Sequence, residues 1–169
     1  RALYGYAYVL TGDAADADDL LQEALVRAFK RGRGPESVDA AHAYVKRAIQ
    51  TTFIDTHRRA SVRPRRDHRD AERVMSDPTA ASATREALLQ AVLSLPPRER
   101  ACLVMRYLDG LASPAIAAEL GIAPGTVRGY LAAAIATLQR TYGDFGLDAT
   151  DALEGGSDHV VITSKGGSR

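Results

Sequence analysis

The stretch from Ile116 to Leu138 reads IAAELGIAPGTVRGYLAAAIATL and decides the fold. Its apolar residues recur at helical spacing on both sides of Gly121, which together with Ile122 and Ala123 predicts a tight turn between two helices. Apolar side chains around this turn are expected to be buried and to hold the two helices at a fixed crossing angle. They belong to Ile116, Leu120, Ile122 and Val127.

A helix, a glycine-containing turn and a second helix make up the helix-turn-helix, a motif that presents its second helix to the major groove of DNA. The exposed positions at the start of that second helix are the ones that could reach bases or phosphates. They are Thr126, Arg128, Gly129 and Tyr130. The alternative is a helical hairpin within an unrelated bundle, which the pattern by itself leaves open.

The rest of the chain has the same helical character, since its long segments repeat apolar residues at helical rather than alternating spacing. We predict an all-α protein of two small helical domains, residues 1–59 and 84–142. Residues 60–83 have too few apolar residues to form a core, so we interpret them as a flexible linker between the two domains. A tail of unknown role, residues 143–169, follows.

Several helix boundaries can be predicted from turn residues. Gly12 and Asp13 are expected to end a helix over 3–10 and to cap the next, over 16–30. Further helices are expected over 40–59, 98–108 and 114–120, with others starting at 84 and 124. The helix over 16–30 is amphipathic, and its core-facing residues are expected to be Leu21, Leu25, Ala28 and Phe29.

The formal net charge of the chain is +1, but the charges are unevenly distributed. Between residues 58 and 73, seven arginines stand against only Asp67, Asp70 and Glu72. Such a basic block can hold a polyanion by counterion release even when the whole protein is close to neutral. A solvated linker without a partner is the alternative, and charge alone does not choose between the two.

Some function classes find no support in the composition. Cys102 is the single cysteine, so no intramolecular disulfide or cysteine-cluster metal site can form, and we expect a buried apolar role for it. His42, His57, His68 and His159 lie apart, without metal-ligand spacing. We therefore expect no catalytic site, metal or cofactor. No apolar run approaches the roughly 20 residues that span a bilayer, and no secretory signal is expected, which favours the cytoplasm.

Four motifs follow one another along the chain. They are DADDLLQEA from Asp16 to Ala24, AYVKR from Ala43 to Arg47 running on to FIDTHRR from Phe53 to Arg59, LPPRER from Leu95 to Arg100, and GTVR from Gly125 to Arg128. In order and spacing they resemble the sigma factors of the extracytoplasmic-function (ECF) class of the sigma-70 family, particularly actinobacterial members, over roughly residues 3–142. Each motif is weak by itself, but four in register are specific.

The resemblance implies a transcription initiation factor, not an enzyme, that works when bound to core RNA polymerase. It implies that residues 1–59 are region 2, which binds the core and recognises and melts the −10 promoter element. Residues 84–142 would be region 4, which reads the −35 element. The expected partners are the β and β′ subunits of the core, promoter DNA and a regulator such as an anti-sigma factor, with no insertion into a membrane.

The same resemblance implies roles for individual residues. The helix over 16–30 would dock on the polymerase clamp helices, with polar contacts from Asp18, Asp19, Gln22 and Glu23. The helix from Ala43 and the arginines after it would hold the −10 element open. The residues assigned to that element are Lys46, Arg47, Thr51, His57, Arg58 and Arg59. Tyr44 and Phe53 are expected to belong to the core rather than to stack on bases.

Two positions depart from the family pattern. The family commonly has an asparagine beside the base pocket, where this chain has Thr51. After the recognition-helix arginine the family carries further basic and hydroxyl residues, whereas Gly129, Tyr130 and three alanines follow Arg128 here. Arg128 is therefore expected to supply most of the sequence preference at the −35 element.

A stand-alone helix-turn-helix regulator is the main rival interpretation. It would account for the residues from 84 onward but leave residues 16–59 unexplained. Because such regulators usually dimerise to read paired half-sites, a stable DNA-bound dimer without polymerase would favour it.

Overall fold

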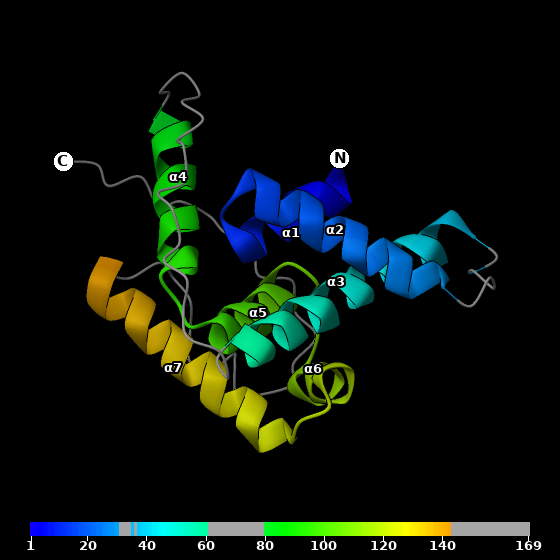
Figure 1. The fold of residues 1–169 in the computed structure, drawn as a ribbon. Helices are drawn as coiled ribbons and strands as arrows, with labels where there is room; N and C mark the ends of the chain where they lie inside the picture. The colour runs from blue at the N-terminus through cyan, green and yellow to red at the C-terminus, as the bar shows by residue number, and fades with distance from the viewer. Residues whose placement is uncertain (31–34, 36, 61–79, 143–169) are drawn as a thin grey trace.

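The structure is a computed structural model that describes residues 1–30, 35, 37–60 and 80–142 (Figure 1). Residues 31–34, 36, 61–79 and 143–169 lie outside this description, and with them most of the predicted linker and the predicted tail. The described residues form seven α-helices and no strand, which confirms the predicted all-α class. The helices are α1 (Ala2–Thr11), α2 (Ala14–Phe29), α3 (Val38–Ala60), α4 (Ala80–Leu93), α5 (Pro97–Tyr107), α6 (Ser113–Leu120) and α7 (Pro124–Tyr142).

The helices α1, α2 and α3 pack into a first unit. The helix α1 ends at Thr11 because Gly12 takes a left-handed φ of 80° and returns its N–H to a carbonyl of the last turn. The carboxylate of Asp13 then caps α2 by accepting hydrogen bonds from the backbone N–H groups of Ala15, at 2.8 Å, and Asp16, at 3.0 Å. This turn ends one helix and starts the next as the sequence predicts.

The buried face of α2 differs from the predicted one. The residues of α2 that are buried are Ala17, Leu20, Ala24 and Ala28. Of the predicted set only Ala28 is buried, because Leu25 is 37% and Phe29 42% exposed and Leu21 is half-buried. The prediction for Leu25 and Phe29 is wrong by one position, or about 100° around the helix. Small alanine side chains face inward, which lets α2 lie close to α1 and α3.

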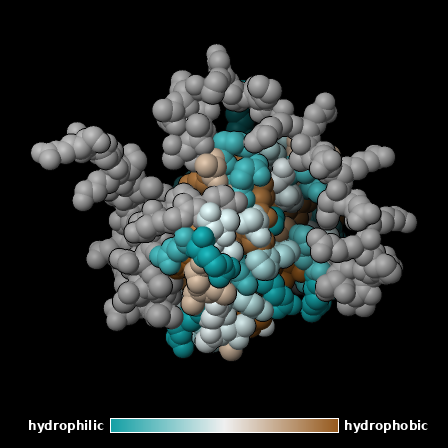
Figure 2. Space-filling view, turned by 90° about the vertical axis from the view of Figure 1, so that its left-hand side faces the viewer, coloured by the Kyte–Doolittle hydropathy of each residue, from teal (hydrophilic) through white to brown (hydrophobic). Residues whose placement is uncertain are grey.

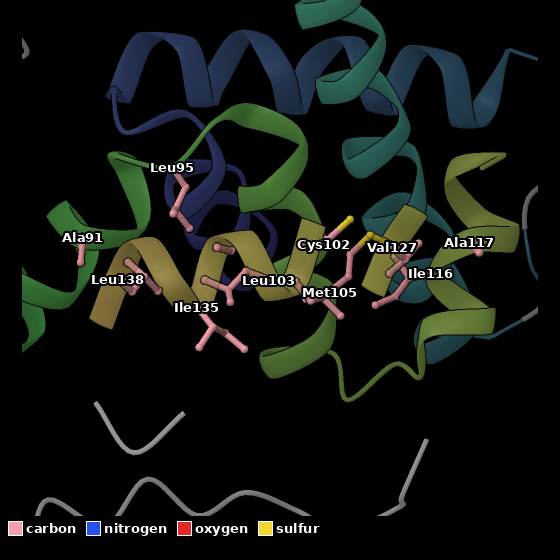
Figure 3. Close-up of a cluster of buried hydrophobic side chains, with 12 residues drawn as sticks. Ala91, Leu95, Cys102, Leu103, Met105, Ile116, Ala117, Val127, Ile135 and Leu138 are labelled. Atoms are coloured by element: carbon pink, nitrogen blue, oxygen red, sulfur yellow. The ribbon is translucent and has the colours of Figure 1, made fainter. Parts of the chain in front are cut away.

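The helices α4 to α7 form a second unit around the predicted turn. Met105, Ile116 and Val127 meet in its core, where α5, α6 and α7 come together (Figure 3). Gly121 ends α6 with a left-handed φ of 65°, and its N–H bonds to a carbonyl of the last turn. Leu120 and Ile122 pack, partly buried, against the same cluster. Burial is thus confirmed for Ile116 and Val127, whereas Leu120 and Ile122, also predicted to be buried, are covered only in part.

The two units touch each other through α5. Ala101 and Val104 belong to the core of the first unit, whereas Cys102, Leu103 and Met105 belong to the core of the second. All five are buried, so α5 is covered on every side. In Figure 1, α5 lies at the centre of the molecule, and it contacts both α3 and α7. The two predicted helical units are therefore present, and α5 contributes side chains to the cores of both.

Candidate nucleic-acid interface

The start of α7 brings together most of the residues predicted to reach the −35 element. Thr126, Arg128 and Gly129 are exposed, while Val127 and Leu131 are buried beneath them and anchor the helix. The N-terminus of a helix favours anions such as phosphate because its free N–H groups point outward. Three of the predicted residues therefore share an accessible surface at the positive end of a firmly packed helix.

The fourth predicted residue, Tyr130, is only partly available. Its side chain is half-buried and packs against the core of the second unit. The next exposed positions along α7 are Ala133 and Ala136, and polar residues follow only near its C-terminus. The face shown in Figure 2, which is the left-hand side of Figure 1, accordingly mixes hydrophilic and hydrophobic side chains. Arg128 is the main charged group at the start of α7.

The residues predicted to hold the −10 element divide between two faces of α3. Arg47, Arg58 and Arg59 are exposed, and the carboxylate of Asp55 lies 3.8 Å from the Arg58 guanidinium. The hydroxyl of Thr51 donates to the backbone carbonyl of Arg47 at 3.0 Å, so it bonds to its own helix. The guanidinium groups of Arg47, Arg58 and Arg59 therefore lie on the outside of α3.

Two other residues predicted for the −10 element make contacts inside the protein. The ring of His57 packs edge-to-face on Phe53, with ring centres 4.5 Å apart. The ammonium group of Lys46 lies 2.6 Å from the carboxylate of Asp109, which belongs to the second unit. Lys46 and His57 are both only partly exposed.

The two aromatic residues predicted to be in the core have different positions. Phe53 is 2% exposed, as predicted, whereas Tyr44 is 45% exposed. The prediction for Tyr44 is wrong because Val45, the next residue, takes the inward position on α3. The Tyr44 ring instead lies edge-to-face with Phe29 of α2, with ring centres 6.4 Å apart.

The acidic face of α2 is exposed as predicted. Asp18, Asp19 and Gln22 are open to solvent, and Glu23 bonds to Arg27 one turn later at 2.5 Å. Arg27 also reaches Asp55 of α3 at 3.4 Å, which ties the two helices together. Next to this polar face lie the apolar side chains of Leu25, Val26 and Phe29, which are all exposed. The sequence pattern predicts two of them, Leu25 and Phe29, in the core and so does not indicate this apolar surface.

A polar cluster between the two units was also not predicted. The Asp109 carboxylate accepts hydrogen bonds from the Tyr6 hydroxyl and from Gln50 Nε2, both at 2.7 Å. Burial, and secondly the Asp109 carboxylate, raise the pKa of Tyr6 above its usual range, so the hydroxyl stays protonated and can donate. In the sequence, Asp109-Gly110 reads only as a helix stop, and nothing in it indicates donors about 60 and 100 positions away.

Among the described residues, no group of three or more His, Cys, Asp and Glu side chains is placed to hold a metal ion. None of the described helices is both long and apolar enough to cross a membrane.

Comparison with known proteins matches both units. Residues 1–63 match the family Sigma-70 region 2, and residues 85–138 match Sigma-70, region 4. The RNA polymerase sigma-E factor of Streptomyces coelicolor is 33% identical over 153 residues, which cover 90% of this chain and 86% of that protein. The ECF RNA polymerase sigma factor SigL of Mycobacterium tuberculosis is also 33% identical, and 86% of this chain and 85% of that protein are covered.

A solved structure shares the fold. The co-crystal structure of the sigma factor RpoE with the anti-sigma factor NepR from Bartonella quintana matches with a TM-score of 0.59, over 82% of this chain and 88% of that chain, at 23% identity. The family assignment rests on the two sequence relatives, because each is 33% identical to this chain over at least 85% of its own length. The chain belongs to the sigma-70 family, in its extracytoplasmic-function class.

Proposed function

We propose that this chain directs core RNA polymerase to promoters, with residues 1–59 acting at the −10 element and residues 84–142 at the −35 element. The observation that carries the proposal is that both family regions form packed units whose predicted contact residues lie mostly on the outside. RNA synthesis itself is then catalysed by the polymerase, in the cytoplasm. The chain supplies placement and strand opening.

The surface proposed for core binding is the exposed face of α2. Its polar part consists of Asp18, Asp19, Gln22 and Glu23, and the neighbouring exposed apolar residues include Leu25 and Phe29. An apolar centre with a polar rim is the usual make-up of a protein interface. Because both parts lie on one helix, α2 can bind a helical partner along its length.

The surfaces proposed for DNA lie on α3 and α7. Arg47, Arg58 and Arg59 would hold phosphates of the melted −10 region, where each contact contributes through counterion release. At the −35 element Thr126 and Arg128 would reach into the major groove, with Arg128 as the candidate for a bidentate contact to guanine. Gly129 lets the helix approach the DNA backbone, and Tyr130 supports α7 from the core side.

The test is binding to purified core polymerase by the double variant Asp19→Lys/Glu23→Lys. Reversal of two charges should lower affinity for the core at least tenfold and abolish run-off transcription from genomic promoters. The reversal also breaks the exposed pair of Glu23 with Arg27, but such pairs contribute only about 0.3–0.5 kcal/mol, too little to unfold the helix.

The matched control is the double variant Asp39→Lys/Glu86→Lys, which changes the net charge equally at two exposed positions outside α2. It should bind core as the unmodified chain does. Circular dichroism of both variants should show unchanged helicity. Equal co-purification of all three proteins with core would contradict the proposal, and a DNA-bound dimer in the absence of polymerase would support the stand-alone regulator.

A further inference from the structure

We propose that Gly125 is a positioning residue for Arg128. Because Gly125 has no side chain, the Arg128 guanidinium can lie over it, one turn back along α7, and this position sets which base of the −35 element the arginine reaches. The inference rests on the proposed function for the role of Arg128 in reading DNA. The position of the guanidinium over Gly125 is a property of the free chain, which can be measured without polymerase or promoter.

The backbone of α7 does not require a glycine at position 125. Gly125 is exposed and is the second residue of the helix. Of the glycines that the structure describes, only Gly12, Gly110 and Gly121 have a positive φ, so Gly125 has a backbone conformation that any L-residue can adopt. Glycine lowers the stability of a helix relative to alanine, because it loses more conformational freedom on folding. Its presence here therefore needs a reason other than helix formation.

The surroundings of Gly125 give such a reason. Apart from its neighbours in the chain and the backbone of its own helix, the only described atom within 4 Å of a Cβ atom built at Gly125 is Nη2 of Arg128, at 3.9 Å. By the same measure Gly129, which is also exposed, has no atom within 4 Å. Contact with the arginine thus distinguishes Gly125 from the other glycine of α7.

The direction of the Arg128 side chain follows from helix geometry. Side chains of an α-helix lean towards its N-terminus and lie over the residues three and four positions earlier. Gly125 is three positions before Arg128. The distance of 3.9 Å is an ordinary van der Waals contact, which a single methyl group at position 125 would keep. The atoms beyond Cβ of a longer side chain would enter the space that the guanidinium fills and would displace it.

The Arg128 guanidinium can bind DNA from this position. In the part of the chain that the structure describes, it has no hydrogen-bond or ion-pair partner, so its five N–H donors are available. It lies beside the N-terminal turn of α7, and in a helix-turn-helix the N-terminal residues of the second helix contact the base edges of the major groove. The contact with Gly125 therefore places the donors at the end of the helix that meets the bases.

A small displacement of this guanidinium is enough to change the base that it reads. Atoms in van der Waals contact lie about 3.5–4.0 Å apart. Successive base pairs of DNA are separated by about 3.4 Å. A side chain at position 125 that displaces the guanidinium by the width of one atom therefore moves it by about one base pair. It then lies away from the guanine to which it could make a bidentate contact.

Nuclear magnetic resonance of the free, full-length chain tests the position directly. Overhauser contacts are expected between the δ-methylene and Nε protons of Arg128 and the α-protons of Gly125. Gly125→Leu should abolish the contacts of these arginine protons with the backbone of residue 125, and the backbone contacts within α7 should remain. If the unmodified chain shows no such contact between the two residues, the proposal is overturned, whatever the chain does with DNA.

Competitive run-off transcription by the holoenzyme measures the effect on promoter choice, as the preference for a −35 element over a scrambled one. Gly125→Leu should reduce this preference by about the factor lost in Arg128→Ala, about 5- to 150-fold for a bidentate arginine contact, and Gly125→Ala should reduce it much less. The midpoint of thermal unfolding should not fall in either variant, because alanine and leucine both favour a helix more than glycine does. The matched control is Ala136→Leu, exposed three turns further along α7, which should leave the preference unchanged.

The double variant Gly125→Leu/Arg128→Ala shows whether position 125 acts through the arginine. It should have the same −35 preference as Arg128→Ala alone. If leucine lowers the preference by a further, equal factor in that background, it acts on the DNA directly and the proposal is wrong. An unchanged preference in Gly125→Leu alone would also contradict it. If the Overhauser contacts are present but the unmodified holoenzyme shows no −35 preference, the proposed function of α7 fails, while Gly125 still positions Arg128 in the free chain.

Discussion

At the scale of single residues, two glycines with the same backbone conformation differ in their surroundings. Gly12 and Gly121 both have a positive φ, of 80° and 65°. A Cβ atom at Gly12 would lie 2.7 Å from Leu93 Cδ2 in the other unit, whereas at Gly121 it would meet nothing within 4 Å. Gly121 is therefore required by the turn alone. Gly12 is required both by the turn and by the contact with Leu93 of the second unit.

This difference predicts the relative stability of two variants. Gly121→Ala should lower the free energy of unfolding by about 1–2 kcal/mol through backbone strain alone. Gly12→Ala should lower it by about 1 kcal/mol more, since Leu93 is a flexible, half-buried side chain that can partly move away. Urea unfolding followed by circular dichroism measures both. Equal losses for the two variants would mean that Leu93 does not press on this turn.

The thiol of Cys102 gives a prediction that depends on pH. Burial raises the pKa of Cys102 to about 12. Because only the thiolate reacts, Ellman's reagent at pH 8 should modify the folded chain far more slowly than the urea-unfolded chain, whose thiol has a pKa of about 8.5. The raised pKa favours the protonated folded state, so its contribution to stability is complete below about pH 8.5 and declines as the pH rises towards 12. Rapid modification of the folded chain at pH 8 would contradict the burial.

At the scale of elements, the buried face of a helix could be predicted from the sequence where that face consists of large apolar side chains. The pair of helices around Gly121 could be predicted because Ile116 and Val127 are large apolar residues at helical spacing, and both are fully buried. The orientation of α2 was not, because Ala17 and Ala24 give a weak apolar signal while Leu25 and Phe29 give a strong one on the adjacent face. Large apolar residues on an interface resemble core residues in a single sequence, and only the packed structure separates them.

The recognition helix α7 gives a prediction about promoter choice. Arg128→Ala should reduce the preference for a promoter with its −35 element over the same promoter with a scrambled −35 element. The reduction should be about 5- to 150-fold, since a bidentate arginine contact contributes about 1–3 kcal/mol of discrimination. The measurement is competitive run-off transcription by the polymerase holoenzyme.

The matched control for that variant is Arg140→Ala, at the far end of the same helix. Arg140 is exposed, and its guanidinium donates to the hydroxyl of Thr137 at 3.4 Å. Its removal should leave the −35 preference unchanged. If Arg128→Ala behaves like Arg140→Ala, the preference comes from another part of α7 or from the −10 element.

At the scale of the whole molecule, the relation between the two units was the part least accessible from the sequence. Boundaries could be predicted from turn residues and composition, but the donors of Asp109 lie far away along the chain. One signal was present in α5, where Ala101 to Met105 form an unbroken apolar run. A helix that is apolar on all sides is usually buried on all sides, and α5 is covered by both units.

Because α5 contributes to both cores, we expect the two units to unfold together. Val104→Ala should lower the free energy of unfolding by about 2 kcal/mol, from two lost methyl groups and the resulting cavity. Although Val104 packs in the first unit, the loss should be seen equally in α2 and α7, by hydrogen exchange of their slowest amides. The control is Val26→Ala, since Val26 is 68% exposed against 2% for Val104 and should cause almost no loss. If Val104→Ala weakens protection in α2 but leaves α7 unchanged, the two units unfold independently.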